Sequence, residues 1–267
     1  MNRGLRALVP ASFLAVGLVA GACDVSVNEG GDVSVNLVSG LAEEEDQRSY
    51  TLPSDGAFEI QNRNGAIELS AWDEATVEVA IHRQAKARSD EAARALLEQV
   101  QIREEVEPAR VRLSTEGPRD GSIRVRYVVR APRTLATVLA NENGSLQVEG
   151  MAGAVQATMS NGAVTAREIA GAIEASTVNG PVSVELTAVG GEVTLSAVNG
   201  PVRITIPETA KATLSARVVN GRIRTSGLTL EDLDQPSGRE MDGSLNGGGP
   251  AIRLETTNGP IVITGQR

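Results

Sequence analysis

The chain has few of the side chains on which most enzymes and disulfide-bonded secreted domains depend. Its 267 residues contain one cysteine, Cys23, and one histidine, His82. A single cysteine leaves no intramolecular disulfide, so burial of a core must hold the fold together. A single histidine excludes sites built from several histidines, and we interpret His82 as a structural residue at the end of a strand. We expect no metal and no cofactor.

Aromatic and basic side chains are also scarce. Aromatic residues make up 2% of the chain, and 34 acidic residues outnumber 25 basic ones, giving a net charge of -9. Proteins that bind nucleic acid present basic patches, often with aromatic residues among them. Neither occurs here, so we expect no nucleic-acid partner and no electrostatic attraction to anionic lipid.

Long apolar runs are absent except at the start. Arg3 and Arg6 precede an apolar segment from Ala7 to Ala20, and the small residues that follow end at Cys23. This order is typical of a secretory signal peptide, here residues 1–22. The lone cysteine after small residues resembles a bacterial lipobox, which implies cleavage before Cys23 and a lipid such as palmitate on this residue. The alternative is an ordinary secreted protein with an incidental cysteine.

Catalytic patterns are missing as well. No serine lies in a nucleophile elbow, and the glycines at 247–249 lack the following lysine of a phosphate loop. Polysaccharide-cleaving β-helical enzymes place carboxylates on neighbouring rungs. Glu174 and Glu192 suggest such a pair, but they occupy different columns of the repeat described in the next paragraph. We predict that the protein is not an enzyme, and a polysaccharide-acting β-helical enzyme is the third alternative.

What the chain does contain is a repeat that ends in Asn-Gly. The pairs at 143, 161, 179, 199 and 220 lie 18, 18, 20 and 21 residues apart. A near-constant period of this size indicates stacked repeats. Including an earlier pair and a later one, the predicted structural corners are Asn64-Gly65, Asn143-Gly144, Asn161-Gly162, Asn179-Gly180, Asn199-Gly200, Asn220-Gly221 and Asn258-Gly259.

Apolar and polar residues alternate on both sides of each pair. Before Asn179, for example, Ile173, Ala175 and Thr177 form one column, and Val182 and Val184 continue the pattern after Gly180. Period-two alternation predicts strands with one inward and one outward face. Asn and Gly suit tight corners. A two-residue hairpin is the alternative for each pair, but matching columns favour an all-β, β-helix-like solenoid with two short strands per rung.

Four regions follow from these patterns. Residues 1–22 are the signal peptide, and residues 23–50 are a lipidated cysteine and a flexible tether containing the acidic run 43–46. Residues 51–135 form an N-terminal β lobe with one short helix that begins near Ser89, where an N-cap precedes an acidic first turn. Residues 136–267 are the regular solenoid.

Two sets of residues are candidates for interaction. Thr158, Ser176 and Ser196 form an outward hydroxyl column that could bind a polymer or glycan. Residues 229–250 interrupt the period, and we interpret them as an exposed, acidic excursion from one rung. Binding of Ca²⁺ by this excursion is a remote alternative to an interaction with a partner. Its acidic side chains are Glu231, Asp232, Asp234, Glu240 and Asp242.

Several motifs, taken in order, resemble the bacterial putative-adhesin family, whose domain is of the DUF4097 type. They are Phe58 with Asn64-Gly65-Ala-Ile67 and Trp72-Asp73, the helical segment from Ser89, Tyr127 with Pro132, the repeated Asn-Gly-x-Val/Ile, and the segment from Leu245 to Gly259. The match covers about residues 50–267. It implies a β-solenoid at the cell envelope.

These observations predict a lipid-anchored, non-catalytic envelope protein that faces the periplasm or the exterior. It would present an interaction or adhesion surface to an unknown envelope protein or glycan, with the membrane as a partner through the lipid. The alternative is an envelope-stress or sensory accessory protein that acts through a membrane partner.

Overall fold

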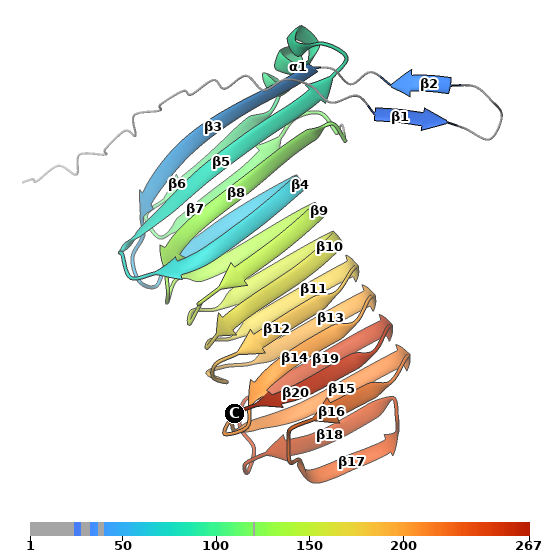
Figure 1. Ribbon diagram of the computed structural model, residues 1–267. Coiled ribbons are helices and arrows are strands. Elements are labelled where there is room, and N and C mark those ends of the chain that lie inside the picture. Colours follow the sequence, from blue (N-terminus) through green and yellow to red (C-terminus); the bar gives the residue numbers. More distant parts are fainter. Residues whose placement is uncertain (1–23, 28–32, 37–39, 120) are drawn as a thin grey trace, which may run out of the picture.

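The molecule is an elongated rod of stacked β-strands with one short helix at one end (Figure 1). The computed structural model describes residues 24–27, 33–36, 40–119 and 121–267. The predicted signal peptide and Cys23 lie outside the described residues. In the described part of the chain, no helix is both long enough and apolar enough to cross a membrane.

Each Asn-Gly pair turns the chain from one sheet into a second sheet that faces it. We call the sheet formed by the segments before the pairs sheet A, and the sheet formed by the segments after them sheet B. The predicted inward columns lie between the two sheets and are buried, as Ile173, Ala175 and Val184 show. Thr225 follows the buried Ile223 by two residues and so continues its column, but it is exposed.

Each rung of the solenoid is either one bent strand or two shorter ones. The bent strands are β4 (Ala57–Trp72), β9 (Ala136–Glu149) and β10 (Val155–Ile169). The paired strands are β11 (Ile173–Asn179) with β12 (Val182–Leu186), β13 (Val193–Asn199) with β14 (Val202–Pro207), β15 (Ala212–Asn220) with β16 (Ile223–Ser226), and β19 (Ala251–Asn258) with β20 (Ile261–Gln266).

Neighbouring rungs pair in parallel with matching columns. Asn161 lies opposite Asn179, and Asn179 lies opposite Asn199. A hairpin at each Asn-Gly would instead pair the two strands of one repeat with each other in antiparallel fashion. The predicted solenoid is therefore confirmed.

The order of the rungs departs from chain order near the end of the chain. The rung of β19 and β20 pairs with β13 and β14 on one side and with β15 and β16 on the other. Residues 251–266 thus lie between rungs 193–207 and 212–226, although they follow both in sequence. Stacking in simple chain order, implied by the constant period, is wrong here.

The opposite end shows the same kind of insertion. On one side, β4 pairs with β7 (Arg110–Glu116) and β8 (Ile123–Pro132), and on the other side it pairs with β9. An early segment therefore lies between two later ones. One hydrophobic core runs through both halves, so the predicted division at residue 135 corresponds to no break in packing.

The predicted tether 23–50 is wrong over its last part. Residues Gly40–Thr51 form β3, which pairs antiparallel along its whole length with β5 (Thr76–Ala87). Alternate side chains of the acidic run face inward, and Asp46 is buried against Arg83, with 2.7 Å between Oδ2 and Nη2. Before it, β1 (Asp24–Val27) and β2 (Val33–Asn36) form a separate two-stranded sheet.

The predicted helix and the remaining lobe strands are present. Helix α1 (Asp90–Leu97) begins after Ser89, whose Oγ accepts a hydrogen bond from the backbone N–H of Ala92 at 3.3 Å. Its buried residues Ala93 and Leu97 lie on the side that packs against β3 and β5. Strand β6 (Gln101–Glu107) then pairs with β7 and forms an edge of sheet A.

The predicted excursion is an end cap. Residues Glu231–Ser237 form β17 and Glu240–Leu245 form β18, and β18 pairs antiparallel with β15. Met241 and Leu245 of β18 are buried. The interpretation as a wholly exposed excursion is therefore wrong for β18, whereas β17 stays on the surface.

Candidate interaction surfaces

The seven corner asparagines form one continuous ladder of side-chain amides. The Nδ2 of every member except Asn64 donates to the Oδ1 of the next asparagine at 2.8–3.0 Å, always in the same direction along the rod. In spatial order the members are Asn220, Asn258, Asn199, Asn179, Asn161, Asn143 and Asn64. Six of them are exposed and Asn64 is half-buried, so the ladder forms a polar edge along the rod.

The glycine after each asparagine lets the rungs approach closely. Gly180 has a φ of +149°, and a Cβ on it would lie 2.1 Å from the carbonyl oxygen of Gly162. No other residue type fits without moving the backbone. The close approach of neighbouring rungs along the ladder therefore depends on these glycines.

The hydroxyl column predicted on sheet A is also in register. Thr158 lies opposite Ser176, which lies opposite Ser196. The next position is Glu255, because the inserted rung follows in space. This column therefore changes from hydroxyl to charged along the rod, and all three hydroxyl residues stay on the outer face.

The two glutamates considered for glycoside chemistry line one shallow groove on sheet A. Glu192 forms an ion pair with Arg253 of the inserted rung. Glu174 accepts a long hydrogen bond of 3.4 Å from the side chain of Gln156.

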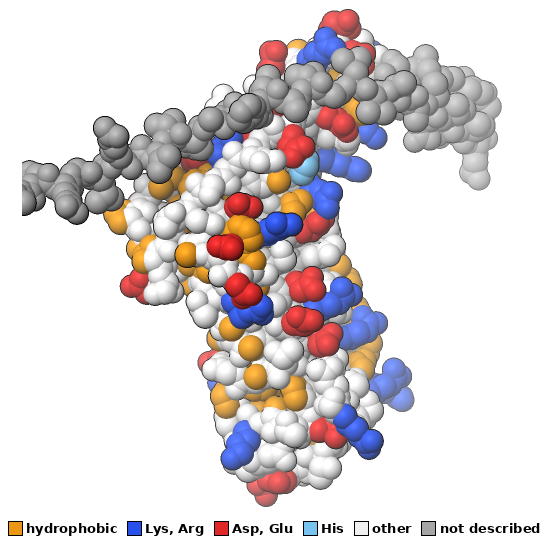
Figure 2. All heavy atoms as spheres, turned by 60° about the vertical axis from the view of Figure 1, so that its left-hand side comes forward, with side chains coloured by type: hydrophobic (Ala, Val, Ile, Leu, Met, Phe, Trp, Pro, Cys, Tyr) orange, Lys and Arg blue, Asp and Glu red, His pale blue; other side chains and the backbone are white. Residues whose placement is uncertain are grey.

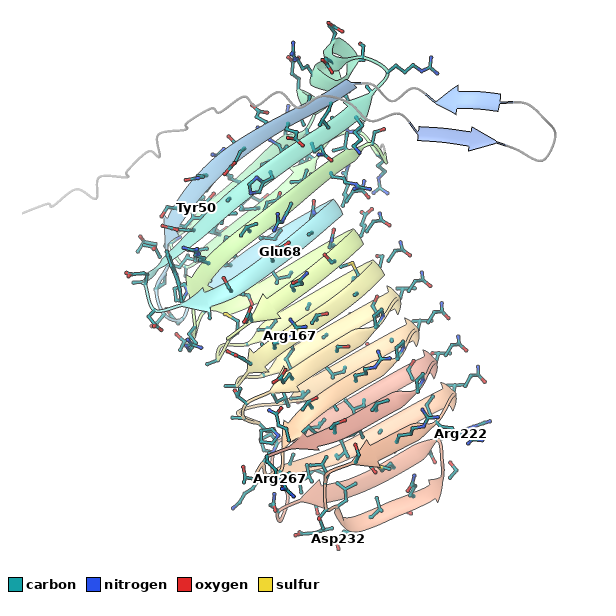
Figure 3. All side chains as sticks on the ribbon, in the orientation of Figure 1. Tyr50, Glu68, Arg167, Arg222, Asp232 and Arg267 are labelled. Carbon is teal, nitrogen blue, oxygen red and sulfur yellow. The ribbon has the colours of Figure 1, made fainter. Side chains whose placement is uncertain are left out.

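The acidic residues of the end cap lie at one tip of the rod, where Figure 3 labels Asp232. Arg217 of β15 lies 3.6 Å from Glu240 and 3.4 Å from Asp242. Glu231 accepts a hydrogen bond from the backbone N–H of Gly247 at 3.0 Å, and Asp234 is exposed. No group of three or more metal-ligating side chains occurs within the described ranges.

A polar network fills the interior of the lobe at the opposite end, near Tyr50 in Figure 3. The hydroxyl of Tyr127 lies 2.7 Å from the hydroxyl of Thr115, which donates to Asn62 at 3.0 Å. Burial raises the pKa of Tyr127 to about 12. Burial and a hydrogen bond to Glu104 likewise raise the pKa of Tyr50. Both hydroxyls therefore remain protonated and act as structural donors.

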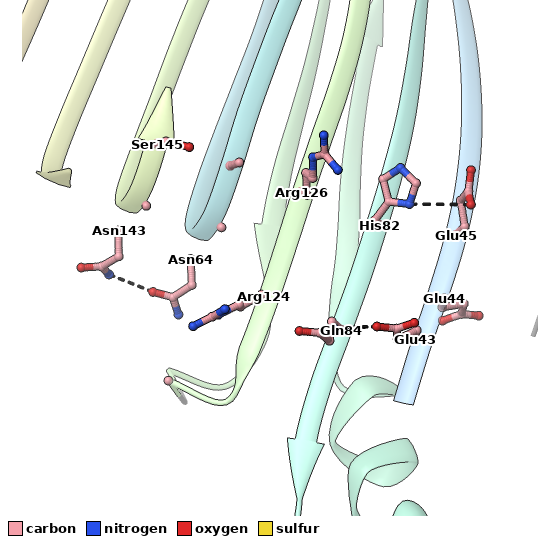
Figure 4. A pocket seen from close by; sticks show the side chains of 14 residues that line it. Glu43, Glu44, Glu45, Asn64, His82, Gln84, Arg124, Arg126, Asn143 and Ser145 are labelled. Carbon is pink, nitrogen blue, oxygen red and sulfur yellow. Dashed lines mark hydrogen bonds and ion pairs between the residues drawn. The ribbon is translucent and has the colours of Figure 1, made fainter. Parts of the chain in front are cut away.

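A groove that the sequence interpretation missed crosses the outer face of sheet B in this lobe (Figure 4). Its volume is about 910 Å³, and strands β3, β5, β8, β4 and β9 each contribute side chains. Two rows of residues cross the first three strands. One row is Glu43, Gln84 and Arg124, and the other is Glu45, His82 and Arg126.

Charge is ordered across the groove. The carboxylates lie on β3, uncharged or weakly basic groups lie on β5, and the guanidinium groups lie on β8. Glu43 accepts from Gln84 at 2.6 Å, and Glu45 lies 3.6 Å from Nδ1 of His82. His82 is thus a surface residue of this groove. The i, i+2 spacing of each charged pair puts both members on one face of a strand, and that signal could have revealed the shared face of each pair but not the rows across the strands.

The face shown in Figure 2 carries acidic and basic side chains close together along the rod. On this face the two charges alternate and neither sign forms a large region of its own. Apolar side chains are also exposed beside the asparagine ladder, where Val178, Val198 and Val219 precede their asparagines and are 46%, 43% and 59% exposed.

The sequence profile of the Toastrack DUF4097 family matches residues 27–264. The chain belongs to this family. The match spans the lobe and the solenoid alike, in agreement with the single core. No curated protein matches the chain.

Solved structures are similar to this Toastrack chain to different degrees. One, described as a "putative cell adhesion protein" from Clostridium sporogenes, has a TM-score of 0.51 and 10% identity, and the alignment covers 84% of this chain and 100% of that one. A "putative adhesin" from Bacteroides fragilis has a TM-score of 0.31 and 12% identity over 83% of this chain and 97% of that one. At this identity the first similarity shows the fold alone.

Proposed function

We propose that this Toastrack protein is a lipid-anchored, non-catalytic component of the cell envelope that presents its rod as an interaction or adhesion surface. The observation that carries the proposal is the uninterrupted asparagine ladder, which continues from Asn64 to Asn220 through every rung. A rigid row of amides at the rung spacing of about 4.8 Å is a regular display of donors and acceptors. Such a display suits contact with an extended partner.

The arrangement of the two sheets supports a binding role over a catalytic one. The inward columns are filled by small aliphatic side chains, and the grooves lie on the outer faces of the sheets. Enzymes of solenoid fold place paired carboxylates in such grooves, but Arg253 holds Glu192 as an ion pair here. The name of the structure from Clostridium sporogenes agrees with adhesion.

The anchor is proposed at Cys23, at the end of the apolar segment that begins at Ala7. A lipid on the cysteine sulfur and an acyl chain on the new N-terminus together would give stable membrane attachment, because several chains bury far more apolar surface than one. The rod would then extend from the membrane surface with its ladder accessible.

Membrane fractionation of cells that express Cys23→Ser tests the anchor. We expect the variant to lose membrane attachment while its β circular-dichroism spectrum stays unchanged. Gel mobility must separate the mature form from a precursor held by its uncleaved signal. Mature-size, unacylated protein that remains in the membrane fraction would refute the anchor.

Binding of the purified protein to isolated envelope material tests the surface. We expect Asn161→Asp together with Asn179→Asp to reduce this binding, since like charges replace neutral amides along the ladder. The matched control is Glu185→Gln on β12, which lies on the outer face away from the ladder. Equal binding by all three proteins would contradict the role of the ladder.

A further inference from the structure

We propose that the groove on sheet B of the lobe binds a short peptide that carries both a free ammonium group and a free carboxylate. The inference deepens the proposed function, since it assigns a ligand class to one surface of the rod. It rests on the ordered charge of the two rows, with carboxylates on β3 and guanidinium groups on β8.

The β8 side of the groove has free capacity for an anion. Arg126 is occupied by Glu68, with distances of 2.9 and 2.6 Å in a two-point contact. Arg124 is exposed, and within the described part of the chain no carboxylate lies at ion-pair distance from it. An arginine guanidinium suits a carboxylate because it offers parallel donors in a fixed plane.

The asparagine ladder ends beside this arginine. Asn143 donates its amide to Oδ1 of Asn64, so the ladder presents the Nδ2 group of Asn64 at this end. Figure 4 shows Asn64 next to Arg124 on the floor of the groove. Both groups only donate hydrogen bonds into this space, and a carboxylate is the ligand group that accepts from both.

The β3 side has the opposite character. Glu43 and Glu45 are held by an uncharged amide and by His82, respectively, and not by arginine or lysine. Their carboxylates can therefore still accept an ammonium group. Glu44, between them in sequence, is directed elsewhere and pairs with Arg83 at 2.9 Å.

The distance across the groove sets the size of the ligand. Strands β3 and β8 are separated by β5, and two strand spacings amount to about 9.6 Å. An extended chain advances about 3.3–3.6 Å per residue, so roughly three residues place their two charged ends at this separation. The lining contains Glu43, Glu44 and Glu45, and these carboxylates disfavour a long polyanion. No Phe, Tyr or Trp side chain lines the groove to stack on a sugar ring. A zwitterionic tripeptide has the required length, carries only one negative charge and needs no aromatic side chain for stacking.

Isothermal titration of the purified full chain, kept in detergent, with trialanine tests the proposal. We expect trialanine to bind, and we expect its N-acetylated and C-amidated forms to bind at least about tenfold more weakly, because each loses one charge-assisted contact. Binding should also weaken as NaCl is raised.

Variants assign the two ends. Arg124→Gln should abolish the advantage of trialanine over its C-amidated form, and Glu43→Gln together with Glu45→Gln should abolish its advantage over the N-acetylated form. Arg203→Gln is the matched control, because Arg203 projects from the outer face of the same sheet on β14, outside the groove. Circular dichroism verifies that each variant is folded.

Absence of trialanine binding at millimolar concentration, or equal binding of the blocked forms, would overturn the inference. So would unchanged affinity in the Arg124 variant. These results are independent of the anchor and the ladder, since a failure at the groove leaves the Cys23→Ser and asparagine experiments unaffected.

Discussion

Each corner of the rod combines two residues with different tasks. Asparagine links one rung to the next through its side-chain amide, as Asn179 does with Asn161 at 2.8 Å. Glycine removes the Cβ that would strike the rung beneath it. Neither residue alone makes the corner, because the ladder needs both the amide and the close approach.

At the residue scale, Gly180→Ala should destabilise the fold by at least ~2 kcal/mol. The new methyl group would lie 2.1 Å from the oxygen of Gly162, and its backbone φ of +149° is unfavourable for alanine. Urea denaturation followed by circular dichroism measures the change.

Gly238→Ala is the matched control. A Cβ on Gly238 meets nothing within 4 Å, so its free energy of unfolding should change by at most about 0.5 kcal/mol. Equal losses in the two variants would show that the corner geometry is not what makes Gly180 necessary.

Some inward residues could be placed from sequence although they are polar. Thr177 and Thr256 occupy apolar columns, and the alternation correctly predicts that they are buried. Their hydroxyls donate to corner carbonyls, Thr177 to Gly162 at 3.1 Å and Thr256 to Gly200 at 2.9 Å. The acceptor lies on another rung, so the sequence pattern shows the burial but not the hydrogen bond.

At the scale of the element, alternation predicts the solenoid strands well and fails for strands that carry charge inward. Strand β3 contains an acidic run that is typical of solvated chain. Its inward Asp46 is stabilised by Arg83, which lies on β5 and is 37 positions away in sequence. The groove could not be predicted either, because its rows combine residues that are distant in sequence. These rows form only when β3, β5 and β8 are side by side.

The cap strand β18 should be needed for stability. Met241 is 2% exposed and packs in the core at the end of the rod, so Met241→Ala should cost about 2–5 kcal/mol. Leu233→Ala on β17 is the control, because Leu233 is 50% exposed, and its cost should stay near 0.5 kcal/mol or below. Thermal denaturation of both variants measures these losses of stability. A stable Met241 variant would restore the interpretation of this segment as a dispensable excursion.

At the scale of the whole molecule, both ends of the rod contain a rung that lies out of chain order. Sequence could not show this, because inward columns are interchangeable. Ile252, Leu254 and Thr256 match the columns of rung 193–207 as well as those of rung 212–226. The repeat predicts that rungs stack but leaves their order open.

The inserted rung makes the last third of the rod interdependent. A chain that stops after Pro250 would lack β19 and β20, and rung 212–226 would lose both of its parallel neighbours. We expect hydrogen exchange to show lost protection from residue 193 to residue 226. A chain that lacks only the exposed Arg267 should keep wild-type protection. Retained protection in the shorter chain would mean that rung 212–226 can stack directly on rung 193–207.

The inserted rung also means that an earlier part of the chain cannot take its final place until a later part is present. The ribosome makes residues 212–226 before residues 251–266, yet the later rung separates the earlier one from its neighbour in the rod. An exported chain arrives from its N-terminus onward, so rung 212–226 reaches the envelope before the forty residues that lead from Ser226 to Gln266. During that interval the finished part of the chain ends in rung 193–207 with an unpaired strand edge, and such edges are sites of aggregation. For a protein that folds after export to the envelope, a chaperone there that shields this edge until Gln266 has arrived would therefore increase the yield of correctly ordered rods.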